Sequence, residues 1–135
     1  MKKLLVSLLA LVVLLLSGCG TPEMADKRYV GDGESLRQLK KACDLNDGFV
    51  CSRLGFLYMN GEGVKKNYSK AKRYYSKACD LNDKSGCYML GFFYEYGSGG
   101  LEQNYLNAKK YYSKACDLNV TKGCVSYNEL KEKGY

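Results

Sequence analysis

Six of the seven cysteines share one spacing, and thiols at a fixed spacing either form disulfides or hold a metal. Three pairs, each separated by eight positions, are Cys43 and Cys51, Cys79 and Cys87, and Cys116 and Cys124. If the three pairs fold alike, the simplest rule joins each cysteine to its partner at this spacing. Zinc is one alternative, although zinc sites prefer closer cysteines or histidine, and the chain has no histidine. Reduced core thiols are the other alternative, which an oxidising compartment disfavours.

The seventh cysteine, Cys19, follows a segment typical of bacterial export signals. A basic start precedes an apolar run of 13 residues at positions 4–16, and two small residues follow it. The run is too short for a bilayer core, which needs about 20 helical residues. Residues 16–19, Leu-Ser-Gly-Cys, resemble a lipobox, which implies cleavage before Cys19 and acylation of its thiol. We therefore expect a signal peptide at residues 1–18 and a lipid anchor at Cys19, with ordinary secretion as the alternative.

The remaining chain divides into a tether and one domain. Residues 19–33 hold the only proline and show no helical periodicity, which predicts a flexible tether. Residues 34–135 are long enough for one modest domain or a short repeat array. Gly20, rather than aspartate, follows the lipidated residue, so the enterobacterial sorting rule favours the outer membrane, facing the periplasm or the surface. A soluble secreted or periplasmic protein is the second expectation.

The net charge of +7 is mild and indicates a solubilising surface. We expect no nucleic-acid partner for an exported protein. Weak attraction to anionic lipid or cell-wall polymer remains open.

A repeat organises the domain. The string Lys-Ala-Cys-Asp-Leu-Asn begins at Lys41, Lys77 and Lys114, with periods of 36 and 37 residues. Periods of this length are typical of helical solenoids, in which helix pairs stack in one direction. The sequence therefore predicts an all-α fold made of αα-hairpins.

Two kinds of helix alternate along this period. The first kind, named the B helix, covers residues 68–79 and 105–116, where alanine and tyrosine recur at spacings of three and four. The second kind, named the A helix, covers residues 49–60 and 86–96. The expected order is a partial B helix from about Ser35, two full A/B repeats, and a degenerate last A helix from about Gly123. This order gives six helices, and each cysteine pair staples a B helix to the next A helix.

Glycines lie in the middle of both complete A helices. Gly55 and Gly91 each cost roughly 1 kcal/mol in helix propensity. We expect a neighbouring helix to approach the backbone closely at both positions.

The repeat pattern resembles the SEL-one-like repeat, and the paired cysteines resemble the cysteine-rich branch of that family, the Helicobacter cysteine-rich proteins. The resemblance is carried by Leu54-Gly55, the turn at residues 61–64, Lys70-Ala71, Tyr74-Tyr75 and Lys77-Ala78, and it covers roughly residues 35–134. It implies a right-handed αα superhelix of the tetratricopeptide type, used mostly to hold peptides or partner proteins. The branch also includes penicillin-binding proteins and slow β-lactamases, so that activity is the alternative expectation.

The residues themselves identify no catalytic group. A serine β-lactamase needs a serine and a lysine one helical turn apart, and no Ser-x-x-Lys occurs in the sequence. Metallo-β-lactamases need histidine, which is absent, and no glycine-rich loop indicates a phosphate site. We expect no cofactor and no metal, and we favour a non-enzyme.

Comparing the two complete repeats suggests a binding surface. Positions that are identical in both are best explained by packing, whereas A-helix positions that differ are free to face a partner. If A helices line the concave side, these positions form a groove for an extended segment. The groove residues are Ser52, Arg53, Met59, Asn60, Tyr88, Met89, Glu95 and Tyr96.

The leading hypothesis is therefore an exported, lipid-anchored, monomeric scaffold. Its expected partners are the membrane, through the anchor, and a protein or peptide in the groove, with peptidoglycan or a β-lactam as other candidates. Asn119, within Asp-Leu-Asn-Val-Thr, also matches an extended N-glycosylation sequon, although the same residues form the repeat turn.

Overall fold

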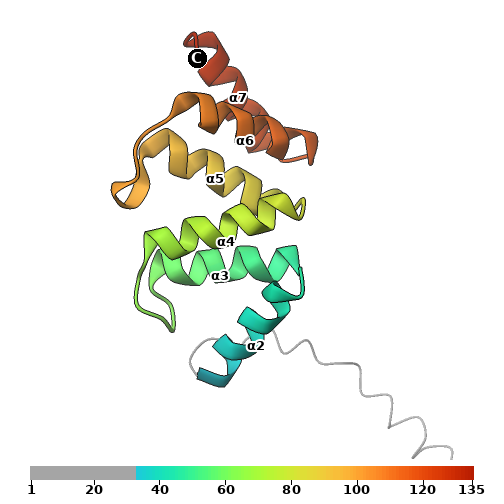
Figure 1. Cartoon of the computed structure of the whole chain (residues 1–135). Coiled ribbons are helices and arrows are strands. Elements are labelled where there is room, and N and C mark those ends of the chain that lie inside the picture. Colours follow the sequence, from blue (N-terminus) through green and yellow to red (C-terminus); the bar gives the residue numbers. More distant parts are fainter. Residues whose placement is uncertain (1–32) are drawn as a thin grey trace, which may run out of the picture.

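A computed structural model describes residues 33–135; the predicted signal peptide, Cys19 and the tether up to residue 32 lie outside the described residues. The described part is helical throughout, and its helices stack in chain order, with α2 at one end and α7 at the other (Figure 1). The elements are α2 (Gly33–Asp44), α3 (Gly48–Asn60), α4 (Tyr68–Asp80), α5 (Lys84–Tyr96), the 3-10 helix η1 (Ser98–Gly100), α6 (Tyr105–Asp117) and α7 (Thr121–Glu132).

The predicted all-α, disulfide-stapled array of six helices is confirmed. Helices α2, α4 and α6 are the B helices, and α3, α5 and α7 are the A helices. Three predicted starts were two residues late, because α2 begins at Gly33, α5 at Lys84 and α7 at Thr121. The apolar pattern marks only the buried face, so it misses the polar first turn of a helix.

Each B-to-A turn uses the Leu-Asn pair that follows the B helix. Asn46, Asn82 and Asn119 all take positive φ, between 59° and 69°, a conformation that asparagine tolerates better than most residues. In the first two turns the next residue is an aspartate, Asp47 or Asp83, whose side chain accepts a hydrogen bond from the third residue of the A helix. The third turn has valine there, so α7 begins without a side-chain cap.

The A-to-B connections begin at a glycine and end at an asparagine. Gly61 and Gly97 close α3 and α5 in the left-handed conformation, with φ of 70° and 59°. Asn67 and Asn104 then cap α4 and α6 through their side-chain oxygens. Asparagine is among the residues that cap helices best, so both of these B helices begin with a satisfied backbone donor.

The mid-helix glycines make room for tyrosine rings rather than for a neighbouring backbone. A Cβ atom on Gly55 would lie 2.9 Å from the ring of Tyr75, and one on Gly91 would lie 2.5 Å from the ring of Tyr112. Both tyrosines are buried and come from the following B helix. A neighbouring helix therefore approaches closely at both expected positions, and the group that makes the approach is a tyrosine side chain.

Two helices approach each other closely through their backbones beside the second and third cysteine pairs. A Cβ atom on Gly86 would lie 2.9 Å from the carbonyl oxygen of Tyr75, and one on Gly123 would lie 3.1 Å from that of Tyr112. Val50 occupies the equivalent position beside the first pair. Its side chain packs on the core between α2 and α3, and α2 is inclined to the stack (Figure 1).

The three cysteine pairs are joined where B and A helices meet, with Cα atoms 4.8, 4.5 and 4.5 Å apart. Cys43 and Cys51 belong to one apolar cluster, and Cys79 and Cys87 belong to the central one. Their sulfurs are therefore part of the apolar core. The Cys116–Cys124 bridge lies near the end of the array and is partly exposed.

Burial of tyrosine should make the fold sensitive to alkaline pH. Tyr75 is buried, and burial raises the pKa of its phenol above the ordinary value of 10.0. Because the folded protein holds this proton more tightly, stability is complete below pH 10 and falls above it, by about 1.4 kcal/mol per pH unit. Urea unfolding at pH 9, 10 and 11 should show this loss, and Tyr75→Phe should reduce the slope without abolishing it, because the pKa of the buried Tyr112 is also raised. Equal slopes in both proteins would contradict the prediction.

Candidate functional site

The A helices line one face of the stack, and this face is hollowed between neighbours. Of the three hollows described below, the largest has a volume of about 450 Å³, lies between α3 and α5, and is also bordered by Tyr75 of α4. Its lining from the A helices and the adjoining loop consists of Phe49, Ser52, Arg53, Phe56, Leu57, Glu62, Ser85 and Met89. Together with Tyr75, five of the nine lining side chains are apolar or aromatic, and the other four are polar or charged, a mixture that suits a binding cleft.

Two further hollows continue the first one in both directions. One of about 320 Å³, between α2 and α3, shares Phe49 and Arg53 with it. The other, of about 410 Å³, shares Met89 and reaches Phe92 and Tyr68. We name this continuous surface the A-helix groove, defined by Phe49, Arg53, Phe56, Met89 and Phe92.

Six of the eight predicted groove residues line these three hollows. Arg53 and Met89 lie at the two junctions, where one hollow passes into the next. The six are Ser52, Arg53, Met59, Asn60, Tyr88 and Met89. Glu95 and Tyr96, near the end of α5, line none of the three.

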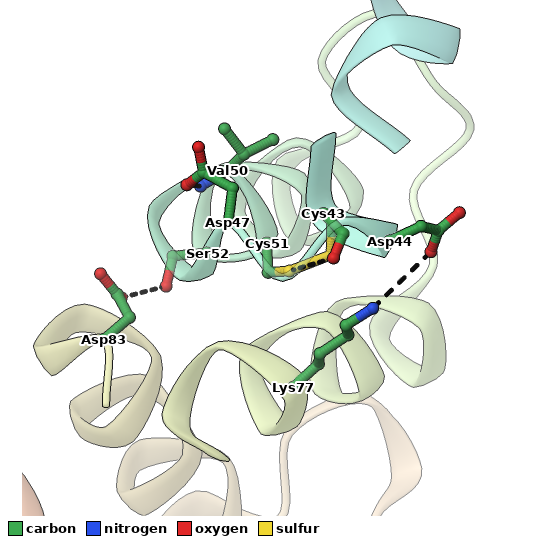
Figure 2. The surroundings of a disulfide bond; sticks show 8 residues. All are labelled: Cys43, Asp44, Asp47, Val50, Cys51, Ser52, Lys77 and Asp83. Atoms are coloured by element: carbon green, nitrogen blue, oxygen red, sulfur yellow. Dashed lines mark hydrogen bonds and ion pairs between the residues drawn. A yellow bond between two sulfur atoms is a disulfide. The ribbon is translucent and has the colours of Figure 1, made fainter. Parts of the chain in front are cut away.

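Ser52 has a structural partner that the repeat comparison did not reveal. Its side chain is buried, and its hydroxyl donates a hydrogen bond to the carboxylate of Asp83, the cap of α5 (Figure 2). In the next repeat the equivalent residues are Tyr88 and Val120, and both pack against the central apolar cluster. A polar pair in one repeat has thus been replaced by an apolar pair in the next, so this difference between repeats serves internal packing.

Glu95 and Tyr88 are also engaged within the fold. The Tyr112 hydroxyl donates to the Glu95 carboxylate at 2.6 Å, and the Tyr88 ring lies 5.6 Å from that of Tyr112. Burial, followed by the hydrogen bond to Glu95, raises the pKa of Tyr112. Tyr96 is different, because it is 60% exposed and touches Phe92, at 4.6 Å between ring centroids.

The aromatic residues of the groove were missed by the comparison of repeats. Phe56 and Phe92 are identical in the two repeats, which suggested packing, yet they are 47% and 36% exposed, and Phe49 is 69% exposed. The sequence did contain a signal for the exposure of Phe56 and Phe92, because each directly follows a mid-helix glycine, Gly55 or Gly91. Because successive helical residues are rotated by about 100°, a neighbour of the buried glycine points away from the tyrosine that covers it.

Positive charge is concentrated on the B helices and partly serves to join repeats. Lys77 of α4 lies 3.7 Å from Asp44 at the end of α2 (Figure 2), and Lys114 of α6 donates to the carbonyl oxygen of Cys79 at 2.8 Å. Each lysine thus reaches the carboxyl end of the preceding B helix, where a cation is favourable. These equivalent lysines belong to the scaffold and not to the groove.

The Ser52 hydrogen bond predicts unequal roles for two aspartates that look alike. Asp47→Ala removes only a helix cap and should cost about 1 kcal/mol. Asp83→Ala removes a cap and also leaves the buried Ser52 hydroxyl without its acceptor, so we expect a cost of about 2 to 3 kcal/mol. Urea unfolding of both variants checks this. Equal costs would contradict it, and Ser52→Ala should restore part of the stability lost in the Asp83 variant.

Asn119 is exposed in the third B-to-A turn, between the exposed Asp117 and Thr121. Its φ of 65° matches that of Asn46 and Asn82, so its place in the turn is that of the repeat. Among residues 33–135, no three acidic, cysteine or histidine side chains gather as metal ligands, and no helix is both long and apolar enough to cross a bilayer.

Comparison with known proteins connects this arrangement to one family. The model of the Sel1 repeat matches residues 49–83 and 84–120, so each matched unit comprises one A helix, one B helix and the turn that follows. No curated protein sequence matches the chain significantly.

Solved structures agree with the family model. Helicobacter pylori cysteine rich protein B is 45% identical, with a TM-score of 0.63, over 67% of this chain and 68% of that one. A Sel1 repeat protein from Oxalobacter formigenes is 29% identical, with a TM-score of 0.69, over 75% of this chain and 41% of that one. A protective antigen of uropathogenic Escherichia coli, at 23% identity, shares the fold with a TM-score of 0.69; the match covers 78% of this chain and 22% of the antigen.

Proposed function

Because this chain belongs to the Sel1 repeat family, in its cysteine-rich branch, we propose that it holds a protein or peptide in the A-helix groove, as a monomer tethered to the cell envelope. Repeat scaffolds of this kind are suited to protein binding, since their stacked helices offer an extended surface. Disulfides and the likeness to a Helicobacter cysteine-rich protein indicate an extracytoplasmic protein.

The observation that carries the proposal is the row of exposed phenylalanines in the groove. Phe49, Phe56 and Phe92 line connected hollows and remain in contact with water. Burying such a side chain is worth roughly 1.5 to 3 kcal/mol. A partner that covers the three rings therefore gains affinity without disturbing the core.

Site-specific photo-crosslinking in intact cells tests the groove. Benzoylphenylalanine placed at Phe56 should give a discrete crosslinked product after irradiation. The control is the same residue at Leu106, which is 68% exposed on α6, outside the hollows that form the groove. Products of equal yield at both positions, or none at Phe56, would rule out the groove as the binding surface.

The envelope location rests on the first 33 residues. The proposal comprises a signal peptide at residues 1–18, a lipid anchor at Cys19, a tether at residues 19–33 and a repeat domain at residues 34–135, with the outer membrane as the address. Metabolic labelling with an alkyne fatty acid should mark the wild-type protein and not Cys19→Ala. Membrane fractionation should then place the label in the outer membrane. Unlabelled protein in the periplasmic fraction would favour simple secretion instead.

One contact in the groove favours a second candidate, a penicillin-binding protein with slow β-lactamase activity. The Ser52 hydroxyl donates to Asp83 at the wall of the largest hollow, and Arg53 also lines this hollow, so a nucleophile, a base and a carboxylate-binding group lie in one place. The Asp83 oxygen also accepts a hydrogen bond from the backbone nitrogen of Gly86 at 2.9 Å, so the same carboxylate caps α5.

A chromogenic cephalosporin separates the two candidates. For a binding scaffold, wild-type protein from Thr21 onward and its Ser52→Ala variant should both show only background hydrolysis. Turnover by the wild type that disappears in Ser52→Ala would establish the enzyme.

A further inference from the structure

Arg53 lies in the middle of the A-helix groove. Arg53 lies between Phe49 and Phe56 on one face of α3, at positions i, i+4 and i+7. It lines both the largest hollow and the hollow beside α2, so it stands at their junction. Among residues 33–135 no acidic side chain forms an ion pair with Arg53, and Glu62, which also lines the largest hollow, is not within ion-pair distance.

An arginine between two exposed aromatic rings suits a carboxylate that arrives with apolar neighbours. The guanidinium binds a carboxylate through two parallel hydrogen bonds, and such bonds strengthen when neighbouring apolar groups exclude water. The residue equivalent to Arg53 in the next repeat is Met89, and the surrounding side chains there are Met59, Tyr88 and Phe92. Lys66 also lines that hollow, but its ammonium group lies over the ring of Tyr68, 5.0 Å from the centroid. The groove thus offers the guanidinium of Arg53 at one position and a mainly apolar surface at the next.

This proposal rests on the proposed function: we propose that the A-helix groove binds an extended peptide. The peptide presents one aspartate or glutamate to Arg53 and one large apolar side chain to the hollow around Met89. Neighbouring helices pack about 8 to 10 Å apart, and an extended chain advances about 3.3 Å per residue. The acidic and apolar residues should therefore be separated by about three positions. The combination of Arg53 with exposed phenylalanines matches an acidic residue that has apolar neighbours in a peptide, and the competition experiment below tests a glycan as the other occupant.

Fluorescence anisotropy with one peptide and two matched variants tests this. The probe is fluorescein-Gly-Phe-Glu-Ala-Ala-Phe-Gly-amide, and the variants carry glutamine or lysine in place of the glutamate. The wild-type protein should bind the glutamate probe at least tenfold more tightly than either variant. Arg53→Gln should remove this preference, so that the glutamate and glutamine probes bind alike.

The matched control is Lys72→Gln, which removes the same charge from α4, where Lys72 lies over the ring of Tyr94 at 4.5 Å. It should retain the tenfold preference. Equal affinity of the wild type for all three probes, no binding of the glutamate probe, or the same loss in both variants would overturn the proposal. Crosslinking at Phe56 together with no binding of the glutamate probe would leave the proposed function intact and reject only this peptide class.

N-acetylmuramic acid, which also carries a carboxylate, serves as a competitor. At millimolar concentration it should leave the anisotropy of the bound glutamate probe unchanged. Displacement of the probe by this sugar would overturn the choice of a peptide.

Discussion

Reducing all three disulfides is expected to unfold the protein at 37 °C. Each bridge closes a short loop, since its cysteines are separated by eight positions, and the loop-entropy estimate gives about 2.5 kcal/mol for such a ring. Three independent rings together contribute about 7 kcal/mol, which is comparable to the whole stability of a small domain. Circular dichroism at 222 nm should therefore show a cooperative loss of helix after treatment with a phosphine reductant and alkylation.

The control for this experiment is oxidised protein carried through the same alkylation. Oxidised protein should keep its helix content and its melting temperature. Reduced, alkylated protein that melts within about 5 °C of the oxidised form would contradict the prediction, because each 1 kcal/mol shifts the melting temperature of a domain this size by about 4 to 8 °C.

The bridges should not be reduced together. Cys116 and Cys124 are partly exposed near the end of the array, whereas the cysteines of the other two pairs are fully buried. A reductant can attack a buried sulfur only after the helices open. Limited reduction followed by alkylation and mass mapping should therefore label Cys116 and Cys124 first. Early labelling of Cys79 or Cys87 would contradict this order of reduction. A linkage between cysteines of different pairs would contradict the pairing.

Tyr112→Ala is expected to be the most destabilising single substitution in the core, at about 4 kcal/mol or a fall of about 20 °C in melting temperature. The ring of Tyr112 fills the space above Gly91, where a Cβ atom would lie 2.5 Å from it, and it packs near Tyr88 and Leu130. No neighbouring side chain can fill this space, because the residue opposite the ring is a glycine. Removing the ring therefore leaves a cavity between α5 and α6.

Two further variants divide this effect into its parts. Tyr112→Phe keeps the ring and removes only the hydrogen bond to Glu95, so it should cost about 1.5 to 3 kcal/mol. Tyr96→Ala, which removes an exposed tyrosine from α5, should change stability by less than about 0.5 kcal/mol. Thermal unfolding of the three proteins checks the order. A similar loss in the Tyr96 and Tyr112 variants would show that the tyrosines do not differ in packing.

The order of helices was predictable because a repeat constrains the same pattern several times. One period of 36 or 37 residues, the recurring alanines and tyrosines, and the Asp-Leu-Asn turns were enough to place all six helices of the described part to within two residues. Local rules are sufficient there, since apolar periodicity, asparagine with positive φ and the capping residues each act within a few positions. The same regularity led to the family, which the Sel1 repeat match confirms.

The A-helix groove was harder to predict, because exposure on a solenoid depends on the neighbouring repeat. Comparing repeats placed Arg53 and Met89 in the groove, but it also selected Ser52 and Glu95, whose partners Asp83 and Tyr112 lie 31 and 17 residues away. It excluded Phe56 and Phe92, since identical residues were read as core. Variation and identity between repeats reflect both packing and binding, and sequence alone cannot separate the two.

The sequence by itself therefore determined the elements, their order and the spacing of the thiols, because these follow from interactions within one helix or one turn. Only the tertiary structure decided which side of each A helix remains open. The reason is geometric: a tyrosine from the following B helix covers the glycine of α3 and of α5, whereas the rings of Phe56 and Phe92, about 100° further around each helix, remain exposed beside Arg53 and Met89.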